Sequence, residues 1–185
     1  MSHATDIPVT QAVRFLREKN IPFEGHLYRY EEHGGTAVAA AALNAPEHAV
    51  IKTLVMEDDR GSGMIVLMHG DREVSTKELA RFLGARSVTP SDPGQAMRRT
   101  GYMVGGTSPF GMRTPLPVYA EATIFSMPRV FINGGKRGFL VSIDPAEIRG
   151  ALHVTEVRVG IIPTPGGAGQ SRTVPAPEPP HPPGC

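Results

Sequence analysis

The chain has 185 residues, with 19 basic against 18 acidic side chains and a formal net charge of +1. A chain of this length has room for one domain with a single hydrophobic core. Its near-neutral charge excludes a strongly basic coat, so we expect no DNA partner, and any contact with nucleic acid must use a local patch and be weak. Because the only cysteine is Cys185, an intrachain disulfide and a cysteine-cluster zinc site are excluded.

Targeting and membrane signals do not stand out in the sequence. No basic region followed by an apolar run occurs near Met1, and nowhere do about eighteen apolar residues follow one another. The sequence therefore predicts neither secretion nor a membrane span. Its single cysteine fits the reducing cytosol, and we expect a cytoplasmic protein.

Helical and strand patterns alternate up to about residue 160. Helices are predicted at 9–20, 36–43, 75–83, 93–99 and 145–152, the first with an apolar face that includes Val9 and Leu16. Strands are predicted at 23–30, 49–56, 64–68, 118–120, 129–133, 139–143 and 154–159, with tight turns at 58–63 and 134–138. Because helices and hairpins are interspersed, we expect an α+β fold, a mixed sheet flanked by helices, in one domain over residues 1–160.

The third predicted helix has the clearest end signals. Ser75 and Glu78 have the spacing of a capping box, in which each side chain bonds the other residue's backbone N–H. Leu79 and Phe82 are predicted to lie on its apolar face, and Gly84 stands where a left-handed C-terminal residue is favoured. These signals together predict a short amphipathic helix.

Residues 161–185 differ from the rest of the chain in composition. They hold eight prolines with glycines between them, and such a segment has no means to bury apolar surface. We expect this tail to be disordered, with a proline-rich recognition ligand as the alternative.

The segment 101–111 reads Gly-Tyr-Met-Val-Gly-Gly-Thr-Ser-Pro-Phe-Gly, a composition that neither a helix nor a ladder strand tolerates. Glycine permits positive φ and close approach of a ligand, while Pro109 fixes its own φ. The N–H groups of Gly105, Gly106, Thr107 and Ser108 could therefore converge on a carbonyl or phosphate oxygen. An ordinary tight turn is the alternative.

Two further positions bring positive charge to the predicted domain. Lys52 interrupts an apolar strand, so its ammonium either points into a pocket or faces water from a half-exposed position. The turn with Gly134, Gly135, Lys136 and Arg137 offers backbone donors and two cations that suit a phosphate, or else it is a solvated hairpin.

No pattern indicates a metal, a cofactor or a serine nucleophile. The histidines lack the i, i+4 pairing with a glutamate that a zinc hydrolase uses, and no Walker-type phosphate loop is present. Ser108 precedes a proline, which removes the N–H that a nucleophile elbow uses for its oxyanion hole. His69, Gly70 and Asp71 could be read as a catalytic fragment, but a turn after a strand is the better interpretation.

Several segments, taken in order, closely resemble the YbaK/EbsC family of aminoacyl-tRNA editing domains, which are related to the insertion domain of bacterial prolyl-tRNA synthetase. The segments are 51–54 (Ile-Lys-Thr-Leu), 75–79 with 83–85, 100–111, and 134–138 (Gly-Gly-Lys-Arg-Gly). The resemblance runs from about Val9 to Val159, and the combination is far more specific than any one motif. The proline-rich tail has no counterpart in the family core.

The resemblance implies a free-standing enzyme that hydrolyses the ester of a mischarged tRNA, most typically cysteine on tRNA for proline. It places Lys52 in the pocket, and it implies that the loop 105–109 holds the aminoacyl ester and terminal adenosine through backbone groups. Tyr28 aligns with a pocket tyrosine of the family, although it could equally be a core aromatic. Lys136 or Arg137 would lie near tRNA phosphates, and a transient complex with prolyl-tRNA synthetase would select the tRNA.

Such a site needs no nucleophile, metal or cofactor of its own. An aminoacyl ester is already activated, so orientation and donors on the developing oxyanion suffice, and for a cysteinyl substrate the resemblance implies attack by the substrate's own thiol.

Two departures from the family concern the amino-acid pocket: the segment between Tyr30 and Ala49 is short, and Phe139-Leu140 stands where some relatives carry an acidic residue. A deacylase for alanine or serine, and an inactive module that binds a tRNA end or nucleotide, are the alternatives.

Overall fold

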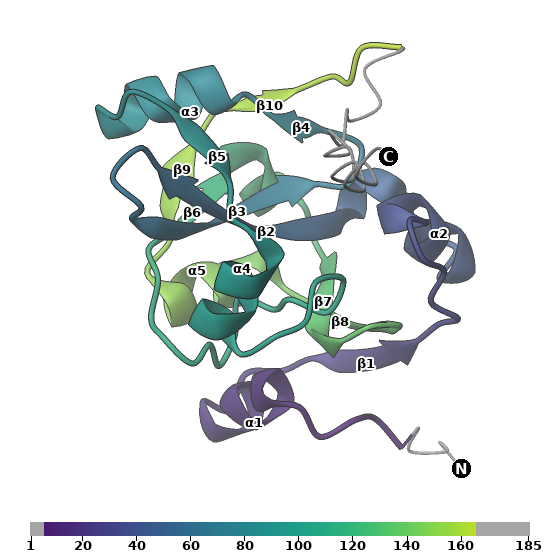
Figure 1. The fold of residues 1–185 in the computed structure, drawn as a ribbon. Coiled ribbons are helices and arrows are strands. Elements are labelled where there is room, and N and C mark those ends of the chain that lie inside the picture. The colour runs from purple at the N-terminus through teal and green to yellow at the C-terminus, as the bar shows by residue number, and fades with distance from the viewer. Residues whose placement is uncertain (1–5, 166–185) are drawn as a thin grey trace, which may run out of the picture.

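A mixed sheet runs through the centre of the protein (Figure 1). The structure, a computed structural model, describes residues 6–165. The strands of this sheet are β1 Glu24–Leu27, β2 Val50–Asp58, β3 Gly63–His69, β5 Val88–Pro90, β6 Val118–Glu121, β7 Val130–Lys136, β8 Phe139–Ile143 and β9 Thr155–Val157. Their order in space is β1-β8-β7-β2-β3-β6-β9, and β5 pairs with β2 off this path.

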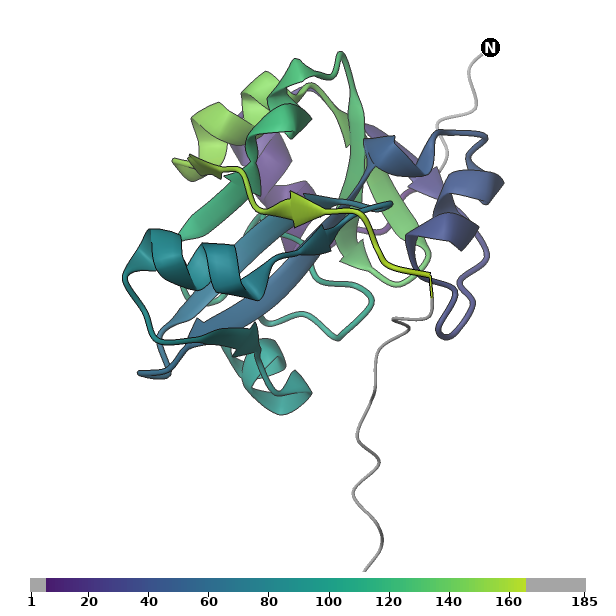
Figure 2. The same ribbon diagram turned by 90° about the horizontal axis from the view of Figure 1, so that it is seen from above.

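Both parallel and antiparallel pairs occur in the sheet. β2 is antiparallel to β3 and β5 but parallel to β7, while β6 is parallel to both β3 and β9. A second sheet of two short strands, β4 Glu73–Val74 and β10 Gly160–Ile161, lies over the main one (Figure 2). The predicted α+β fold with a mixed sheet is therefore confirmed.

Residues 6–165 contain a helix at each of the five predicted places. They are α1 Gln11–Glu18, α2 Gly35–Ala42, α3 Thr76–Leu83, α4 Pro93–Thr100 and α5 Pro145–Leu152, with 3₁₀ turns η1 Glu47–Ala49 and η2 Ala122–Ser126. Figure 1 shows α1 beneath β1 and α3 beside the small sheet, on opposite sides of the main one. No helix of this part of the chain combines the length and hydropathy that a membrane span requires.

The two faces of β3 contribute to two separate hydrophobic clusters. Ile65 and Leu67 point to the side covered by α1 and α5, while Met64, Val66 and Met68 point to the side covered by α3. A strand buried on both faces reads as a continuous apolar run, as β3 does. The sheet therefore forms the middle layer between helices on both sides.

The ends of α3 only partly follow the prediction. The Ser75 hydroxyl accepts from the Glu78 N–H (3.3 Å), and Gly84 is left-handed with φ 65°. The reciprocal half of the capping box is wrong: the Ser75 N–H donates to the Val159 carbonyl, and the Glu78 carboxylate binds Arg81. The Ser75 N–H, which a capping box would bind to Glu78, is thus used by a bond beside the small sheet.

Three further predictions need correction. Phe82 is 55% exposed, because the buried residues of α3 are Leu79 and Ala80. The Phe82 ring instead packs edge-to-face with the Tyr119 ring, with 6.3 Å between the two ring centroids. Val9 is 60% exposed, because Thr10 caps α1 and Val9 precedes the helix. The 134–138 turn is shorter than predicted, since β7 continues to Lys136 through a bulge.

The predicted boundary at residue 160 falls inside a strand. Ile161, the first residue of the predicted tail, pairs with Glu73 in the small sheet. The buried carboxylate of Glu121 accepts from the N–H groups of Val159 and Gly160, both at 2.8 Å, and so holds the entry to β10. Residues 166–185 of the predicted tail lie outside the described residues.

Candidate functional site

A cavity of about 500 Å³ lies where the main sheet has a gap beside β2. On the edge of β2 that faces away from β3, β7 pairs only with Val50 and Ile51, and β5 pairs only with the stretch 56–58. Within the part of the chain that the structure describes, residues 52–54 therefore have no strand partner on this edge. The cavity lies against this stretch and is closed by residues of α2, α4 and the loop 103–107.

The wall of the cavity is mainly apolar, with a few polar groups. Apolar side chains come from α2, β2, α4, β8 and the loop 103–107, and include Ala39, Val50, Leu54, Ala96, Val104 and Leu140. The polar groups among its lining are Tyr28, Tyr30, His33, Thr36, Lys52, Thr53, Ser91, Thr107 and Asn133. An apolar concavity with a small number of polar groups is typical of small-molecule sites.

Lys52 lines this cavity and is the charged side chain of β2 that reaches it. Its Nζ donates a hydrogen bond to the carbonyl of Arg72, in the turn after β3. Burial lowers the pKa of Lys52, and the nearby carboxylates of Glu73, Glu47 and Asp71 oppose that shift. The sequence left open whether the Lys52 side chain points into a pocket or faces water, and in the structure it lies against the cavity.

The loop 103–107 forms another part of the cavity wall. Gly105 has φ 86°, a left-handed conformation that favours glycine, and it lines the cavity together with Thr107. Four backbone N–H groups, those of residues 105–108, were predicted to converge on a ligand oxygen. The N–H of Gly106 instead donates to the Met103 carbonyl (2.9 Å), inside the loop. Gly106 is buried against the backbone of Lys136 and Arg137, and a Cβ added to Gly106 would lie 3.0 Å from the backbone nitrogen of Arg137.

Ser108 and Pro109 lie at the buried base of the loop and do not line the cavity. The Ser108 side chain is fully buried, and its hydroxyl accepts from the N–H of Phe110 (3.3 Å). In this structure the two residues hold the loop in place, while Gly105 and Thr107 face the cavity.

The hairpin between β7 and β8 supports the loop from outside the cavity. The Gly134 carbonyl accepts from the Thr10 hydroxyl, and Gly135 lies in the bulge with φ 97°. Arg137 donates to the Val104 carbonyl (2.8 Å), and its guanidinium lies 5.3 Å from the centre of the Tyr30 ring. Lys136 and Arg137 are exposed, so both cations are open to a ligand that extends out of the cavity.

Tyr28 belongs to the segment that leads out of β1. Its backbone N–H donates to the Gly138 carbonyl (2.9 Å), and its half-buried side chain packs against a small cluster with Leu140. Burial raises the pKa of the Tyr28 phenol, which therefore stays protonated and can donate a hydrogen bond at neutral pH. It both lines the cavity and contributes to the core, so the two interpretations from the sequence are compatible.

Six polar residues of the cavity wall were not predicted as site residues: Tyr30, His33, Thr36, Thr53, Ser91 and Asn133. Thr36 comes from a helix that reads as plain alanine-rich sequence, and Thr53 follows Lys52 in a strand. The Thr53 hydroxyl is buried and has no hydrogen-bond partner within residues 6–165. Asn133 was read as the end of a strand and the first residue of the following turn, but its side chain was given no role, although an Asn-Gly-Gly run signals an asparagine that bonds its own backbone two residues on.

Asn133 links the hairpin to the loop. Its Nδ2 donates to the Gly105 carbonyl (3.0 Å), and its Oδ1 accepts from the Gly135 N–H (2.7 Å). We expect Asn133→Ala to free the loop, raising amide hydrogen exchange at residues 103–107 by about fivefold for a loss of about 1 kcal/mol in local stability. Asn133→Asp is the matched variant, because it keeps the acceptor for Gly135 and loses the donor for Gly105. Unchanged exchange in both variants would show that this link does not hold the loop.

Comparison with known proteins gives consistent results at the level of sequence and fold. Residues 31–151 match the aminoacyl-tRNA editing domain family. EbsC of Enterococcus faecalis, named as a candidate Cys-tRNA(Pro)/Cys-tRNA(Cys) deacylase, is 26% identical over 140 residues, which are 75% of this chain and 85% of EbsC. A proline–tRNA ligase of Desulfotalea psychrophila is 28% identical over 129 residues, 69% of this chain but only 22% of the ligase.

The fold also matches a solved structure described as a candidate trans-editing enzyme for prolyl-tRNA synthetase. That match has a TM-score of 0.72 at 21% identity and covers 83% of this chain and 98% of the other. The matched residues 31–151 include the cavity-lining residues of β2, α4 and the loop 103–107. The chain therefore belongs to the aminoacyl-tRNA editing domain family.

Proposed function

We propose that this protein is a free-standing editing enzyme that hydrolyses the ester bond of mischarged aminoacyl-tRNA, with cysteinyl-tRNA(Pro) as its main substrate. The observation that carries the proposal is that Lys52 and the Gly105 loop, about fifty residues apart in the sequence, line one cavity. The family match to residues 31–151 supports editing in general, and the likeness to EbsC supports the cysteinyl substrate.

The cavity provides orientation and charge for an ester that is already activated. The Lys52 ammonium, as a compact point charge, would hold a substrate oxygen on one wall. The loop at Gly105 and Thr107 would hold the ester and the terminal ribose on the other wall, where backbone donors stabilise negative charge that develops on the carbonyl oxygen. Such preorganised donors act more strongly in a cavity that excludes water than they do in solution.

For a cysteinyl substrate the nucleophile comes from the substrate. The thiol, having lost its proton, attacks the carbonyl carbon and forms a carbon–sulfur bond; the carbon–oxygen ester bond then breaks, and the ribose oxygen takes up a proton. The products are a cyclic thiolactone and uncharged tRNA. The chain's part is to hold the ester and the thiol in a reactive geometry, which can contribute several kcal/mol, on the order of 7 or more in well-oriented cases.

One observation favours a second candidate, the hydrolysis of alanyl-tRNA. Leu140 lines the cavity beside Ala39 and Val50, at the place where some relatives carry an acidic residue. This wall suits a small apolar side chain and offers no charge to a polar one. Cysteine is larger than alanine by one thiol group, and a size difference of one methylene changes binding by only about 1 to 3 kcal/mol, so alanine and cysteine are close competitors.

We further propose that the protein receives its tRNA in a transient complex with prolyl-tRNA synthetase. The formal net charge of +1 gives little general attraction for RNA, so binding of tRNA by this chain alone should be weak and salt-sensitive. Lys136 and Arg137 are exposed near the cavity and would meet phosphates of the acceptor end. A partner that already holds the tRNA raises its effective concentration at the cavity.

The test of the proposed function is deacylation of cysteinyl-, alanyl-, seryl- and prolyl-tRNA(Pro) by the full chain, with spontaneous hydrolysis subtracted. We expect the cysteinyl ester to disappear fastest and the prolyl ester to survive. Fastest loss of the alanyl ester would identify the second candidate. If no ester is hydrolysed but mischarged tRNA analogues still bind, the protein is a binding module and the proposal is wrong.

A further inference from the structure

The turn that follows β3 provides the hydrogen-bond acceptor for Lys52. This turn, residues 69–72, is closed by a bond from the Arg72 N–H to the His69 carbonyl (3.1 Å) and tied to β2 by a bond from the Gly70 N–H to the Val50 carbonyl (2.7 Å). Gly70 has no room for a side chain, since a Cβ would lie 2.6 Å from the Glu47 carbonyl oxygen. The turn is therefore packed tightly against the strand that bears Lys52.

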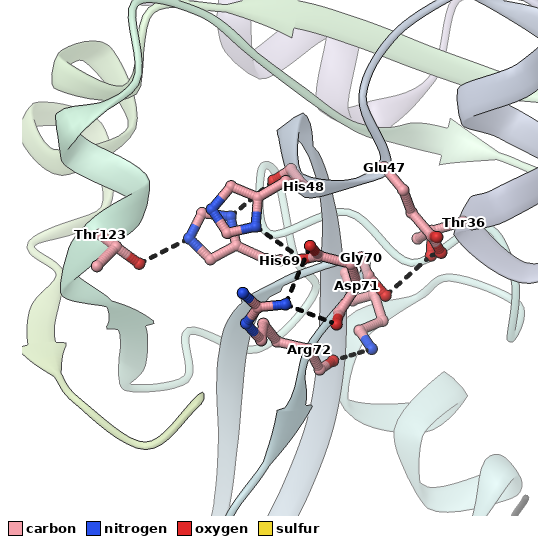
Figure 3. A network of polar contacts seen from close by, with 9 residues as sticks. Thr36, Glu47, His48, His69, Gly70, Asp71, Arg72 and Thr123 are labelled. Atoms are coloured by element: carbon pink, nitrogen blue, oxygen red, sulfur yellow. Dashed lines mark hydrogen bonds and ion pairs between the residues drawn. The ribbon is translucent and has the colours of Figure 1, made fainter. Parts of the chain in front are cut away.

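Asp71 joins this turn to the 3₁₀ turn η1. Its Oδ1 lies 2.7 Å from His48 Nδ1, and its Oδ2 accepts from Arg72 Nη1 at 3.1 Å (Figure 3). Asp71 does not line the cavity, and its side chain is 32% exposed. Its carboxylate thus holds both the residue whose carbonyl binds Lys52 and the neighbouring element.

A buried histidine supports this arrangement from beneath. His69 is 1% exposed; its Nδ1 donates to the His48 carbonyl (2.6 Å), and its Nε2 accepts from the Thr123 hydroxyl (2.7 Å). The rings of His69 and His48 lie over each other (Figure 3), and their centroids are 3.6 Å apart. Burial lowers the pKa of His69, so its ring is neutral at pH 7 and can both donate and accept.

We propose that Asp71 is a positioning residue for Lys52: its carboxylate, bound to His48 and Arg72, fixes the turn whose Arg72 carbonyl holds the Lys52 ammonium at the cavity wall. Asp71 does not line the cavity, so it would act through Lys52. This inference rests on the proposed function only in the assumption that the Lys52 ammonium acts on the ester.

The same carboxylate adds to the electrostatic field at Lys52. Among residues 6–165, the charged groups that act on Lys52 are the carboxylates of Glu73 from β4, Glu47 from η1 and Asp71 from the turn, and the contact with Arg72 is through its backbone carbonyl. Glu73, Glu47 and Asp71 raise the pKa of Lys52 against the larger lowering by burial. Removing the charge of Asp71 should therefore lower this pKa further. Because Lys52 is a cation only below its pKa, catalysis in such a variant should be lost at a lower pH than in the wild type.

The first measurement is a pH titration of the lysine side-chain carbons by nuclear magnetic resonance. The chain has four lysines, Lys19, Lys52, Lys77 and Lys136, and Lys52→Met identifies the signal of Lys52. In Asp71→Asn, which keeps the shape of the side chain, we expect the pKa of Lys52 to fall measurably below its wild-type value. The other three lysines are internal controls and should not move. An unchanged titration of Lys52 would overturn the proposal.

The second measurement is single-turnover deacylation across the pH range. Asp71→Asn should retain most of the neutral-pH rate and lose activity at lower pH than the wild type. Asp71→Ala also removes the bonds to His48 and Arg72, and should slow the reaction at every pH by on the order of tenfold or more. A wild-type rate and pH profile in Asp71→Ala would contradict the proposal. If Asp71→Ala does not fold, Asp71→Asn decides the matter by its Lys52 titration.

The two proposals fail in different ways. If the wild-type chain hydrolyses no ester, the proposed function is wrong, and the lysine titration still shows whether Asp71 positions Lys52. If the esters are hydrolysed but the pKa of Lys52 is the same in wild type and Asp71→Asn, the proposed function stands and this inference is wrong.

Discussion

Replacing Lys52 with alanine is expected to lower the rate constant of cysteinyl-tRNA(Pro) deacylation by about 10²- to 10³-fold, the size of effect seen when one preorganised electrostatic group is removed. The ammonium is half-buried at the cavity wall, where its charge acts through little water. Single-turnover kinetics measure this effect directly, because they separate the chemical step from tRNA binding and product release.

The Lys52→Ala result needs two matched controls. Lys77→Ala removes an exposed lysine of α3, changes the net charge equally, and should leave the rate unchanged. Lys52→Arg keeps the charge but changes its shape and hydrogen-bond geometry, so partial activity is expected. A wild-type rate in Lys52→Ala, in a protein with an unchanged thermal transition, would remove Lys52 from the catalytic site.

The second large effect is expected for Gly105→Ala, with deacylation reduced by on the order of 10- to 100-fold through misplacement of the loop. Gly105 has φ 86°, which costs a residue with a side chain about 1 to 2 kcal/mol. An added Cβ would also lie 2.9 Å from the Tyr30 hydroxyl and 3.3 Å from Arg137 Nε, so two side chains at the edge of the cavity would have to move.

Gly61→Ala is the matched control for this backbone strain. Gly61 has φ 77° and no atom within 4 Å of an added Cβ, and it lies in the turn between β2 and β3. Gly61→Ala should lose about 1 to 2 kcal/mol of unfolding free energy in urea and Gly105→Ala at least as much, while only Gly105→Ala should lose activity. Equal deacylation rates in the two variants would show that the exact path of the loop at Gly105 does not matter for catalysis.

Most of the secondary structure could be predicted because its signals are local. The helix caps at Ser75, Asp92 and Asp144 involve residues two or three positions apart, and each side chain accepts from the first turn of its helix. The strands β4, β5 and β10 were missed, because two or three residues are too few to show a period. Phe82 was misplaced, since spacing alone does not say which apolar residue of a helix meets the sheet.

The predicted site residues fall into two groups: some line the cavity, and others support the loop that lines it. Lys52, Tyr28, Gly105 and Thr107 were singled out from residue type and resemblance, and all four line the cavity. Gly106 and the 134–137 hairpin support the loop from outside it, and Ser108 and Pro109 form the loop's base. Residue type alone does not separate a glycine that faces a ligand from one that packs against another backbone.

By itself, the sequence determined the α+β class, the five helices, the unusual glycine loop and the lysine placed in an apolar strand, because each depends on residues close together in the chain. Only the tertiary structure decided that β7 and β5 leave residues 52–54 unpaired, that Asn133 holds the loop, and that Asp71 reaches His48. The physical reason is that strand register and side-chain contacts between distant segments depend on how the two faces of the sheet are packed, and no short stretch of sequence carries that information.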